Sequence, residues 1–490
     1  MTEPADPADA ADAGDLSPAA TRAALHRAAD LAADYLEGVG SYPVLPPIGP
    51  GGLAAKLPAA PPDEGEPMAR ILDDYRELIE PSVTHWNHPG FLAYFAITGS
   101  APGVAAETLA AALNVNAMVW RTGPGPTELE ERACDWLRSL MGLPEGFHGH
   151  LNDTASVSTL VALAAARHRL RPEVRAEGLS GLPPLVVYAS DQAHSSVDKA
   201  AVVLGLGTEG VRKVASDADF RMVPEALAAA IAEDRAAGRL PMAVVATAGT
   251  TSTTSIDPLA AIAEVSSREG LWLHVDAAYG GAAAICPELR PLFDGIERAD
   301  SIVVNPHKWL FTPVDCSALF ARDPADLVAA FSLVPPAYLQ TGEREVTNLM
   351  DLGIQLGRRF RALKLWMVIR AFGAEGLRRR IRRHCELARA LAERVAAEPG
   401  FELAVPAPLS VVCLRAFAGR PDAERDRLNE ALLEAVNADG RFLLSHTKLH
   451  GRYVIRVAIG NLRTEARHLD ALWELLAETA RRLGGEGAGG

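Results

Sequence analysis

The chain has 490 residues and 49% of them are hydrophobic, so it can form two or three domains around a large core. Its formal net charge of -14 argues against nucleic acid or an anionic membrane as the main partner. Five scattered cysteines without C-x-x-C spacing indicate free thiols in a reducing compartment. With no basic-apolar signal peptide and no long uninterrupted apolar run, we expect a soluble cytoplasmic protein.

The N-terminal part is expected to differ from the rest of the chain. Residues 1–16 are mostly Ala, Asp and Pro, which predicts a disordered tail. Ser17 and Pro18 are typical of a helix start. Residues 42–62 are rich in Pro and Gly but too apolar for a free linker. We therefore expect residues 17–84 to form a segment that packs on another surface, such as a second subunit.

Strand-like and helix-like segments alternate through residues 85–375, which we expect to form a large domain. Continuous apolar strands between amphipathic helices predict an α/β fold with a mostly parallel sheet covered on both faces. Residues 376–490 are expected to form a smaller C-terminal α+β domain. The expected strands are 185–189, 242–246, 271–275, 302–304 and 317–320, then 401–405, 411–415 and 453–458. The expected helices include 159–169, 223–236, one capped by Asp257 and Pro258 that runs to 268, 361–372, 377–397, 423–437 and 464–483.

Two of the expected strands end close to residues that can carry chemistry. Asp276 follows residues 271–275, and Lys308 follows residues 302–304. A lysine beside an apolar strand end is partly desolvated, which leaves its amine able to attack a carbonyl. A buried carboxylate can hold a heteroaromatic nitrogen protonated. Pyridoxal 5'-phosphate (PLP) requires these two groups, a Schiff-base lysine and a pyridinium partner, although a surface lysine and a capping aspartate are the alternatives.

Further polar residues are expected at the same edge of the sheet, where ligands of open parallel sheets bind. His194 follows the strand at 185–189 and is expected to lie flat on the pyridine ring and contact the substrate carboxylate. Thr251, after the strand at 242–246, is expected to contact the cofactor, with turn formation as the alternative. Ala278 is small enough for the ring to pack against it. Thr154, Ala155 and Ser156 precede a helix, so they predict either a phosphate seat or a simple N-cap.

Six segments carry a resemblance to a known family. In these segments the chain resembles the group II PLP-dependent amino acid decarboxylases, and among that family the aromatic-L-amino-acid decarboxylases. The resemblance extends over about residues 20–480. The segments are HPGF at 88–91, TELE at 127–130, SDQAHSS at 190–196, HVDAAY at 274–279, NPHKWL at 305–310 and LGRRF at 356–360.

The resemblance implies a fold-type I PLP-dependent transferase (aspartate aminotransferase-like), with a seven-stranded central sheet and the cofactor in the large domain. It implies that Lys308 is the Schiff-base lysine, that Asp276 pairs with the pyridine nitrogen and that His194 stacks on the ring. It further implies an obligate homodimer with active sites at the interface and the N-terminal segment packed on the partner. The remaining implied cofactor contacts are Ala155, Ser156 and Asn305 at the phosphate, and Thr251, Ala278 and His307 along the cofactor.

The substrate pocket departs from the family pattern in several places. Tyr94, Phe95 and Thr98 are expected to line it, but Ile97 stands where relatives have a threonine, so Thr98 would substitute from the next position. A further departure is the phosphate loop, DTAS at 153–156, where many relatives have glycine before the small polar residue. Asp153 would repel a phosphate and is therefore expected to point away from it. Asn116 and Met118 are expected to reach the partner's site, in place of a more apolar, aromatic pair.

The expected reaction is decarboxylation of an aromatic L-amino acid (Trp, Tyr, Phe or Dopa) to its amine and CO2. One alternative is an aldehyde synthase, which couples decarboxylation to oxidative deamination. A second is a decarboxylase of another amino acid, such as glutamate or histidine. A third, from a different class, is a non-catalytic dimeric scaffold, against which the presence of Lys308, Asp276, His194 and Tyr338 argues.

Tyr338 generates the first testable prediction. In the family, a tyrosine at this position assists protonation of Cα after CO2 leaves, and related aldehyde synthases carry phenylalanine there. Because a phenol can donate a proton and a phenylalanine ring cannot, Tyr338→Phe should shift the product from amine toward aldehyde. Chromatography of amine and aldehyde, with assays of hydrogen peroxide and ammonia, measures the shift. Unchanged amine output would remove the proton-donor role.

Overall fold

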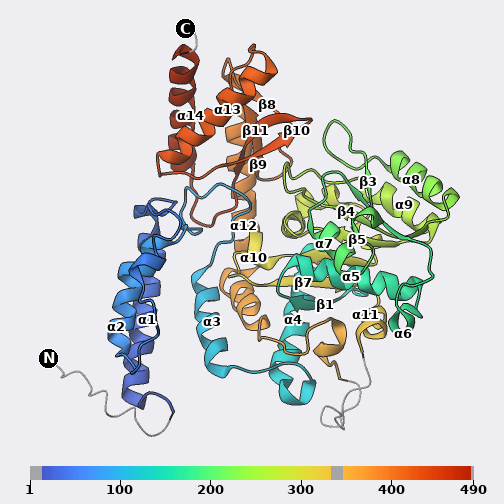
Figure 1. The fold of residues 1–490 in the computed structure, drawn as a ribbon, viewed down its shortest axis with the longest axis horizontal. Helices are drawn as coiled ribbons and strands as arrows, with labels where there is room; N and C mark the ends of the chain where they lie inside the picture. Colours follow the sequence, from blue (N-terminus) through green and yellow to red (C-terminus); the bar gives the residue numbers. More distant parts are fainter. Residues whose placement is uncertain (1–13, 333–345, 487–490) are drawn as a thin grey trace.

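The computed structural model describes residues 14–332 and 346–486. Its central feature is a seven-stranded sheet in the order β1-β7-β6-β5-β4-β2-β3 (Figure 1). Neighbouring strands from β6 to β3 pair in parallel, and β7 runs antiparallel to both of its neighbours. This confirms the expected α/β, mostly parallel sheet of seven strands. The strands are β1 His148–Asn152, β2 Leu185–Ser190, β3 Val211–Val214, β4 Leu240–Thr247, β5 Trp272–Asp276, β6 Ser301–Val304 and β7 Ser317–Ala321.

Helices cover both faces of this sheet, as the alternation of buried residues in β4 shows. Val244 and Ala246 belong to one hydrophobic cluster, and Ala243 and Val245 belong to a second cluster. Successive side chains of a strand point to opposite faces, so each face has its own core. Helix α5 packs into the second core, and α4, α8 and α9 pack into the first. The helices bound in these layers are α4 Pro124–Met141, α5 Ala155–Leu170, α7 Ser196–Val203, α8 Pro224–Ala236, α9 Leu259–Glu269, α10 Pro306–Trp309 and α11 Pro324–Phe331.

A second, four-stranded antiparallel sheet with the order β10-β11-β9-β8 lies in the C-terminal part. Helix α12 runs from the large sheet to this small one (Figure 1). It is two helices joined at Gly373, whose φ of 64° and ψ of 167° break the helix where residues 361–372 and 377–397 were expected to be separate. The elements are α12 Ala362–Ala397, β8 Glu402–Leu403, β9 Val411–Arg415, α13 Asp422–Ala438, β10 Ser445–Leu449, β11 Arg452–Ala458 and α14 Ala466–Glu486.

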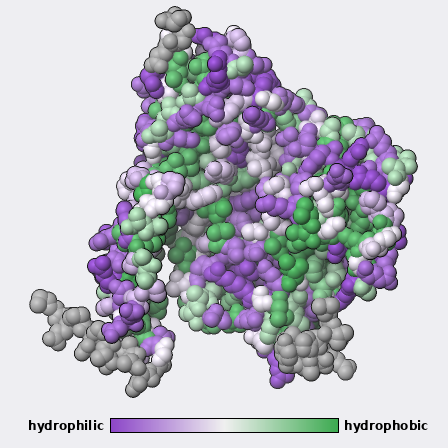
Figure 2. Space-filling view, in the orientation of Figure 1, coloured by the Kyte–Doolittle hydropathy of each residue, from purple (hydrophilic) through white to green (hydrophobic). Residues whose placement is uncertain are grey.

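The N-terminal residues form an arm in which α1 (Pro18–Gly38) and α2 (Met68–Asp74) lie side by side (Figure 1). The Oγ of Ser17 accepts a hydrogen bond from Ala20 N at 3.3 Å, which confirms the expected helix start. Figure 2 shows apolar surface along this arm and on the body beside it. The Pro-rich segment packs at its start on the same chain, because Val44 is buried and its N–H donates to Gly440 O at 2.9 Å.

Two local expectations were wrong. Asp257 does not cap α9; its buried carboxylate accepts hydrogen bonds from the backbone N–H groups of Met222 and Thr247, each at 2.7 Å. The helix expected from residue 159 begins at Ala155, because Thr154 already serves as its N-terminal boundary. Strands β1, β3 and β10 were not anticipated, since their sequences HGHLN, VRKV and SHTKL lack a continuous apolar run.

Across the described ranges, no helix combines the length and the apolar character that crossing a membrane requires. All five cysteines are unpaired thiols; four are buried and Cys385 is half-buried.

Four buried histidines are held neutral inside the fold. Burial lowers the pKa of His150 and His307 to about 3 and that of His274 and His384 to about 4. Hydrogen bonding agrees for His384, whose Nδ1 accepts from Trp309 Nε1 at 2.9 Å while its Nε2 lies 3.1 Å from Asn461 O. A ring that accepts at one nitrogen and donates at the other is the neutral tautomer.

We therefore predict that acid destabilises the protein. These pKa values lie below the unfolded value of 6.5, so the unfolded state binds more protons as the pH falls from 6.5 toward 4. The free energy of unfolding should be fully retained above pH 6.5 and decrease below it. His384→Gln should reduce the slope of the free energy of unfolding against pH by up to about 1.4 kcal/mol per pH unit, because one protonating group of the unfolded state is lost. Urea unfolding at pH 7.5, 6 and 5 tests this, and the exposed His446→Gln should leave the slope unchanged.

Candidate active site

Lys308 and Asp276 come together because their strands are neighbours. Asp276 is the last residue of β5, and Lys308 lies in the short helix α10 that follows β6. Strands β5 and β6 pair in parallel, with Asp276 opposite Val303, so their carboxyl ends lie at the same edge. The carboxylate is 6% exposed, and its Oδ1 accepts from Ala278 N at 3.0 Å. The expected pair of an amine and a carboxylate is therefore assembled at one edge of the sheet.

The amine of Lys308 lies over a stack of three aromatic rings. Its Nζ lies 5.4 Å from the centroid of the Phe95 ring. Phe95 stacks on Tyr279 at 3.8 Å, and Tyr279 stacks on the fully buried Trp309 at 4.7 Å. Burial lowers the pKa of Lys308, and the charge of Arg456 lowers it further, while the charge of Asp276 raises it. The surroundings thus shift the amine toward its neutral form, which is the nucleophilic one.

His194 belongs to the same electrostatic cluster. It follows β2, and its Nδ1 accepts from Ser196 N at 3.1 Å and lies 2.9 Å from Ser196 Oγ. The proton of the neutral ring therefore resides on Nε2. Burial lowers the pKa of His194; the charge of Asp276 opposes this shift, and the charge of Lys308 adds to it. Thr251, in the loop after β4, is exposed.

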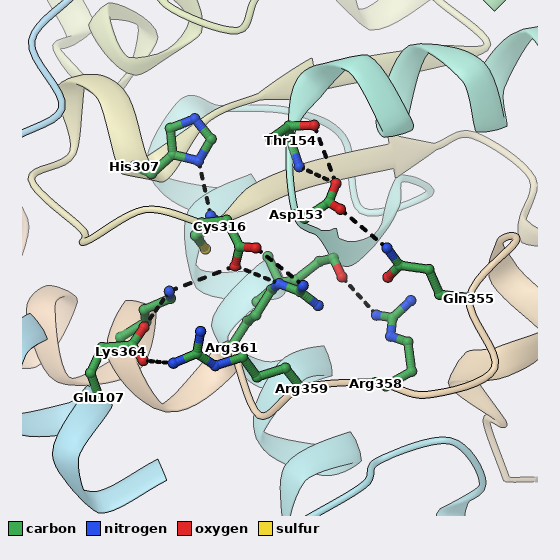
Figure 3. Close-up of polar contacts among 12 residues, drawn as sticks. Glu107, Asp153, Thr154, His307, Cys316, Gln355, Arg358, Arg359, Arg361 and Lys364 are labelled. Atoms are coloured by element: carbon green, nitrogen blue, oxygen red, sulfur yellow. Dashed lines mark hydrogen bonds and ion pairs between the residues drawn. The ribbon is translucent and has the colours of Figure 1, made fainter. Parts of the chain in front are cut away.

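The start of α5 provides backbone donors for an anion. Thr154 is the N-terminal boundary of this helix but does not cap it with its side chain, so the first-turn N–H groups at Ala155 and Ser156 lack such a partner. The Thr154 hydroxyl donates instead to Asp153 Oδ1 at 3.2 Å, and Gln355 Nε2 donates to Asp153 Oδ2 at 3.2 Å (Figure 3). The Asp153 carboxylate is thus bonded to Thr154 and Gln355, and its expected orientation away from a phosphate stays a prediction.

Asn305 and His307 flank the lysine. Asn305 is buried, its N–H donates to Ala278 O at 3.0 Å, and its Oδ1 has no hydrogen-bond partner among the described residues. A buried amide oxygen without a partner fits a position where a ligand is expected. His307 Nδ1 accepts from Cys316 N at 2.9 Å (Figure 3), which leaves Nε2 as the donor of the neutral ring.

Two of the segments that carried the sequence resemblance are joined by a buried ion pair beside β1. Arg358, from the LGRRF segment, is buried and donates to Glu130 Oε1 of the TELE segment at 2.7 Å and to Leu151 O at 2.8 Å. The neighbouring Arg359 and Lys364 both pair with Glu107 (Figure 3). Buried ion pairs fix relative positions more than they add stability, so these segments hold β1 and α4 in place beside the cofactor region.

Comparison with known proteins gives the same answer as the geometry. Residues 50–417 match the family described as "Pyridoxal-dependent decarboxylase conserved domain". The chain belongs to the pyridoxal-dependent decarboxylases. It is 40% identical to phenylacetaldehyde synthase of Arabidopsis thaliana, over 94% of this chain and 95% of that one, and 39% identical to tryptophan decarboxylase 2 of Oryza sativa subsp. japonica, over 94% of each. The crystal structure of Oryza sativa TDC with PLP and tryptamine superposes with a TM-score of 0.92 at 38% identity, covering 96% of this chain and 99% of that one.

PLP is therefore the cofactor of this decarboxylase, and the residues at the sheet edge fit it. Lys308 offers an amine for the cofactor aldehyde and Asp276 a buried carboxylate for the ring nitrogen. The N-terminus of α5 suits the phosphate, and Asn305, whose Oδ1 has no partner among the described residues, stands at the start of the lysine segment.

The expected substrate residues of the decarboxylase are placed unevenly. Phe95 contacts the lysine region, as described above. Tyr94 has a left-handed φ of 50° and is 60% exposed. Thr98 is fully buried, and its Oγ1 has no hydrogen-bond partner in the described part of the chain. Asn116 accepts from Arg358 N at 2.9 Å and contacts Met118 Sδ at 3.6 Å. Neither Asn116 nor Met118 is bonded to Lys308, Asp276 or His194 among the described residues of one chain.

Three residues that matter to this arrangement were missed in the sequence. Ser196 sets the tautomer of His194, Gln355 holds Asp153, and Arg456 acts on Lys308. Only Arg456 left a signal, as the sole charge inside the apolar run of residues 453–458. Tyr338 lies outside the described residues.

Asp276→Asn provides the prediction for this site. The amide keeps an oxygen for the Ala278 N–H but removes the negative charge beside the Lys308 amine and the cofactor ring. We expect cofactor affinity to fall by about tenfold or more, since a lost charge interaction in such surroundings is worth roughly 1.4 kcal/mol or more. Titration of apoprotein with PLP, followed by visible absorbance, measures this. Asp198→Asn, at a surface pair with Lys213, is the matched control; equal affinities for the two variants would contradict the assignment.

Proposed function

We propose that this protein converts an aromatic L-amino acid (Trp, Tyr, Phe or Dopa) to the corresponding amine and CO2. The observation that carries the proposal is the Lys308–Asp276 pair beside the stacked rings of Phe95 and Tyr279. An aromatic wall next to the reactive amine favours a flat apolar side chain on the substrate. Similarity to tryptophan decarboxylase 2 supports the same substrate class.

The roles of the residues follow from their chemistry. PLP, when bound, accepts the electron pair that is released when the bond between Cα and the carboxylate carbon breaks. Lys308 anchors the cofactor and, as a neutral amine, can take up or return a proton. Asp276 holds the ring nitrogen protonated. His194, with its proton on Nε2, has a donor for the substrate carboxylate.

An aldehyde product is the second candidate. The 40% identity to phenylacetaldehyde synthase favours it, whereas Tyr338 favours the amine. The two differ in stoichiometry, because oxidative deamination consumes O2 and releases ammonia and hydrogen peroxide together with the aldehyde.

We further propose a homodimer in the cytoplasm, with each active site completed at the subunit interface. Leu109 and Leu113 of α3 (Ala101–Leu113) are 53% and 60% exposed, and Leu25 on the arm is 53% exposed. Such apolar surface suits a second copy of the chain. Contribution from a partner would also give Asn116 and Met118 a role, as neither is bonded to Lys308, Asp276 or His194 within the described part of its own chain. The acidic composition and the free thiols fit a reducing compartment.

One experiment tests the function most broadly. The holoenzyme is incubated with an equimolar mixture of the twenty amino acids, and the amines and aldehydes formed are identified by mass spectrometry. We expect amines from aromatic amino acids alone. Amines from glutamate or histidine, or no product at all, would contradict the proposal.

Lys308→Ala should reduce decarboxylation by roughly a thousandfold or more, because the amine that anchors the cofactor is lost. The variant should keep the circular dichroism spectrum of the wild type. Lys448→Ala, which removes an exposed lysine from β10, should retain full activity. Undiminished amine production by Lys308→Ala would refute the assignment.

A further inference from the structure

Arg456 is a buried cation that joins three separate parts of the chain. It lies in β11 and is 3% exposed. Its Nε donates to Ser252 O at 3.1 Å, in the loop after β4, and its Nη1 donates to Tyr94 O and lies 3.4 Å from Ser445 Oγ in β10. One guanidinium therefore links the small sheet to the loop at residues 248–255 and to the segment at residues 91–100, which we call the strap.

Within the described part of the chain, the charge of Arg456 has no carboxylate beside it. From 14 to 332 and from 346 to 486, no Asp or Glu pairs with it, and its Nη2 is buried without a hydrogen-bond partner. Burying a guanidinium without a carboxylate is unfavourable, and its bonds to carbonyl oxygens compensate only in part. A neutral side chain would be less costly here if the position had only a packing role.

Phe95 of the strap lies against both Arg456 and the reactive lysine. Arg456 Cζ lies 4.8 Å and Lys308 Nζ lies 5.4 Å from the centroid of the same Phe95 ring. Tyr279 covers that ring at 3.8 Å and an interplanar angle of 13°, so Phe95 is fixed from one side by stacking and contacted by both cations. Phe95 directly follows Tyr94, whose carbonyl Arg456 holds.

We propose that Arg456 is a positioning residue of the lysine site: it holds the strap and the loop after β4 against the small sheet and thereby fixes the ring of Phe95 against the Lys308 amine. This deepens the proposed function and rests on it, because Phe95 is part of the wall that receives the aromatic side chain.

An electrostatic consequence follows from the same geometry. Burial lowers the pKa of Lys308 most; the charge of Asp276 raises it, and the positive charge of Arg456 lowers it further. His194 and His307 also lie in this electrostatic environment, and burial lowers the pKa of each, so both are neutral at pH 7. Among the described residues, Arg456 thus adds to the effect of burial in disfavouring a proton on the Lys308 nitrogen.

The test compares Arg456→Gln, Arg456→Lys and the control Arg452→Gln, an exposed position in the same strand. The pH midpoint of the visible absorption change of each holoenzyme reports the proton on the cofactor-bound Lys308 nitrogen. Arg456→Gln should raise this midpoint by about one pH unit, because a nearby cation is removed. Arg456→Lys should keep the midpoint but raise KM several-fold with little change in kcat, since an ammonium cannot reproduce the fork that holds both carbonyls. Arg452→Gln should match the wild type.

A folded Arg456→Gln variant with the midpoint and KM of Arg452→Gln would overturn the proposal. If Arg456→Gln does not fold, Arg456→Lys decides it, and an unchanged KM is then the contradicting result. The spectral titration needs only bound PLP, so it gives an answer even if the preferred substrate is not aromatic. In that case KM is measured with whichever amino acid the mixture experiment identifies.

Discussion

Two neighbouring parallel strands, β5 and β6, deliver a carboxylate and an amine to the same edge of the sheet, and every other feature of the site is arranged around that pair. Asp276 ends β5, and Lys308 follows β6 by a single short turn of helix. The chain has six lysines. Lys364 is buried in ion pairs with Glu107 and Asp315, and four others are exposed, so Lys308 alone combines an aromatic environment with a nearby carboxylate.

Around this pair, the residues that hold the fold in place differ from the residues that reach the reacting atoms. The buried pair of Arg358 and Glu130 joins two sequence segments that look functional but act as scaffold. Arg361 pairs with Asp315 at 2.9 Å, next to Cys316, whose N–H orients His307. Such contacts hold the pocket in shape without reaching the reacting atoms. Arg456 falls between these classes, because it is hydrogen-bonded to backbone carbonyls of two loops and lies over the Phe95 ring, while its charge reaches the lysine.

The sequence predicted the sheet well where burial on both faces imposes continuous apolar strands, as in β4 and β5. It failed for β1 and β10, whose polar residues gave no strand pattern. Asp276, Lys308 and His194 could be placed at one edge of the sheet because each lies at the end of a recognisable strand, and their catalytic roles stay a prediction. Asp257 was misassigned because its true partners, Met222 and Thr247, are fixed only by the fold. Arg456 was missed for the same reason, since its contacts come from residues near 94 and 252.

The central claim is that Lys308 is the residue that binds PLP covalently. Reduction of the holoenzyme with borohydride, followed by proteolysis and peptide mass spectrometry, tests this directly. The account predicts a single pyridoxyl-modified peptide that contains Lys308. Modification of any other lysine, or of none, would contradict it.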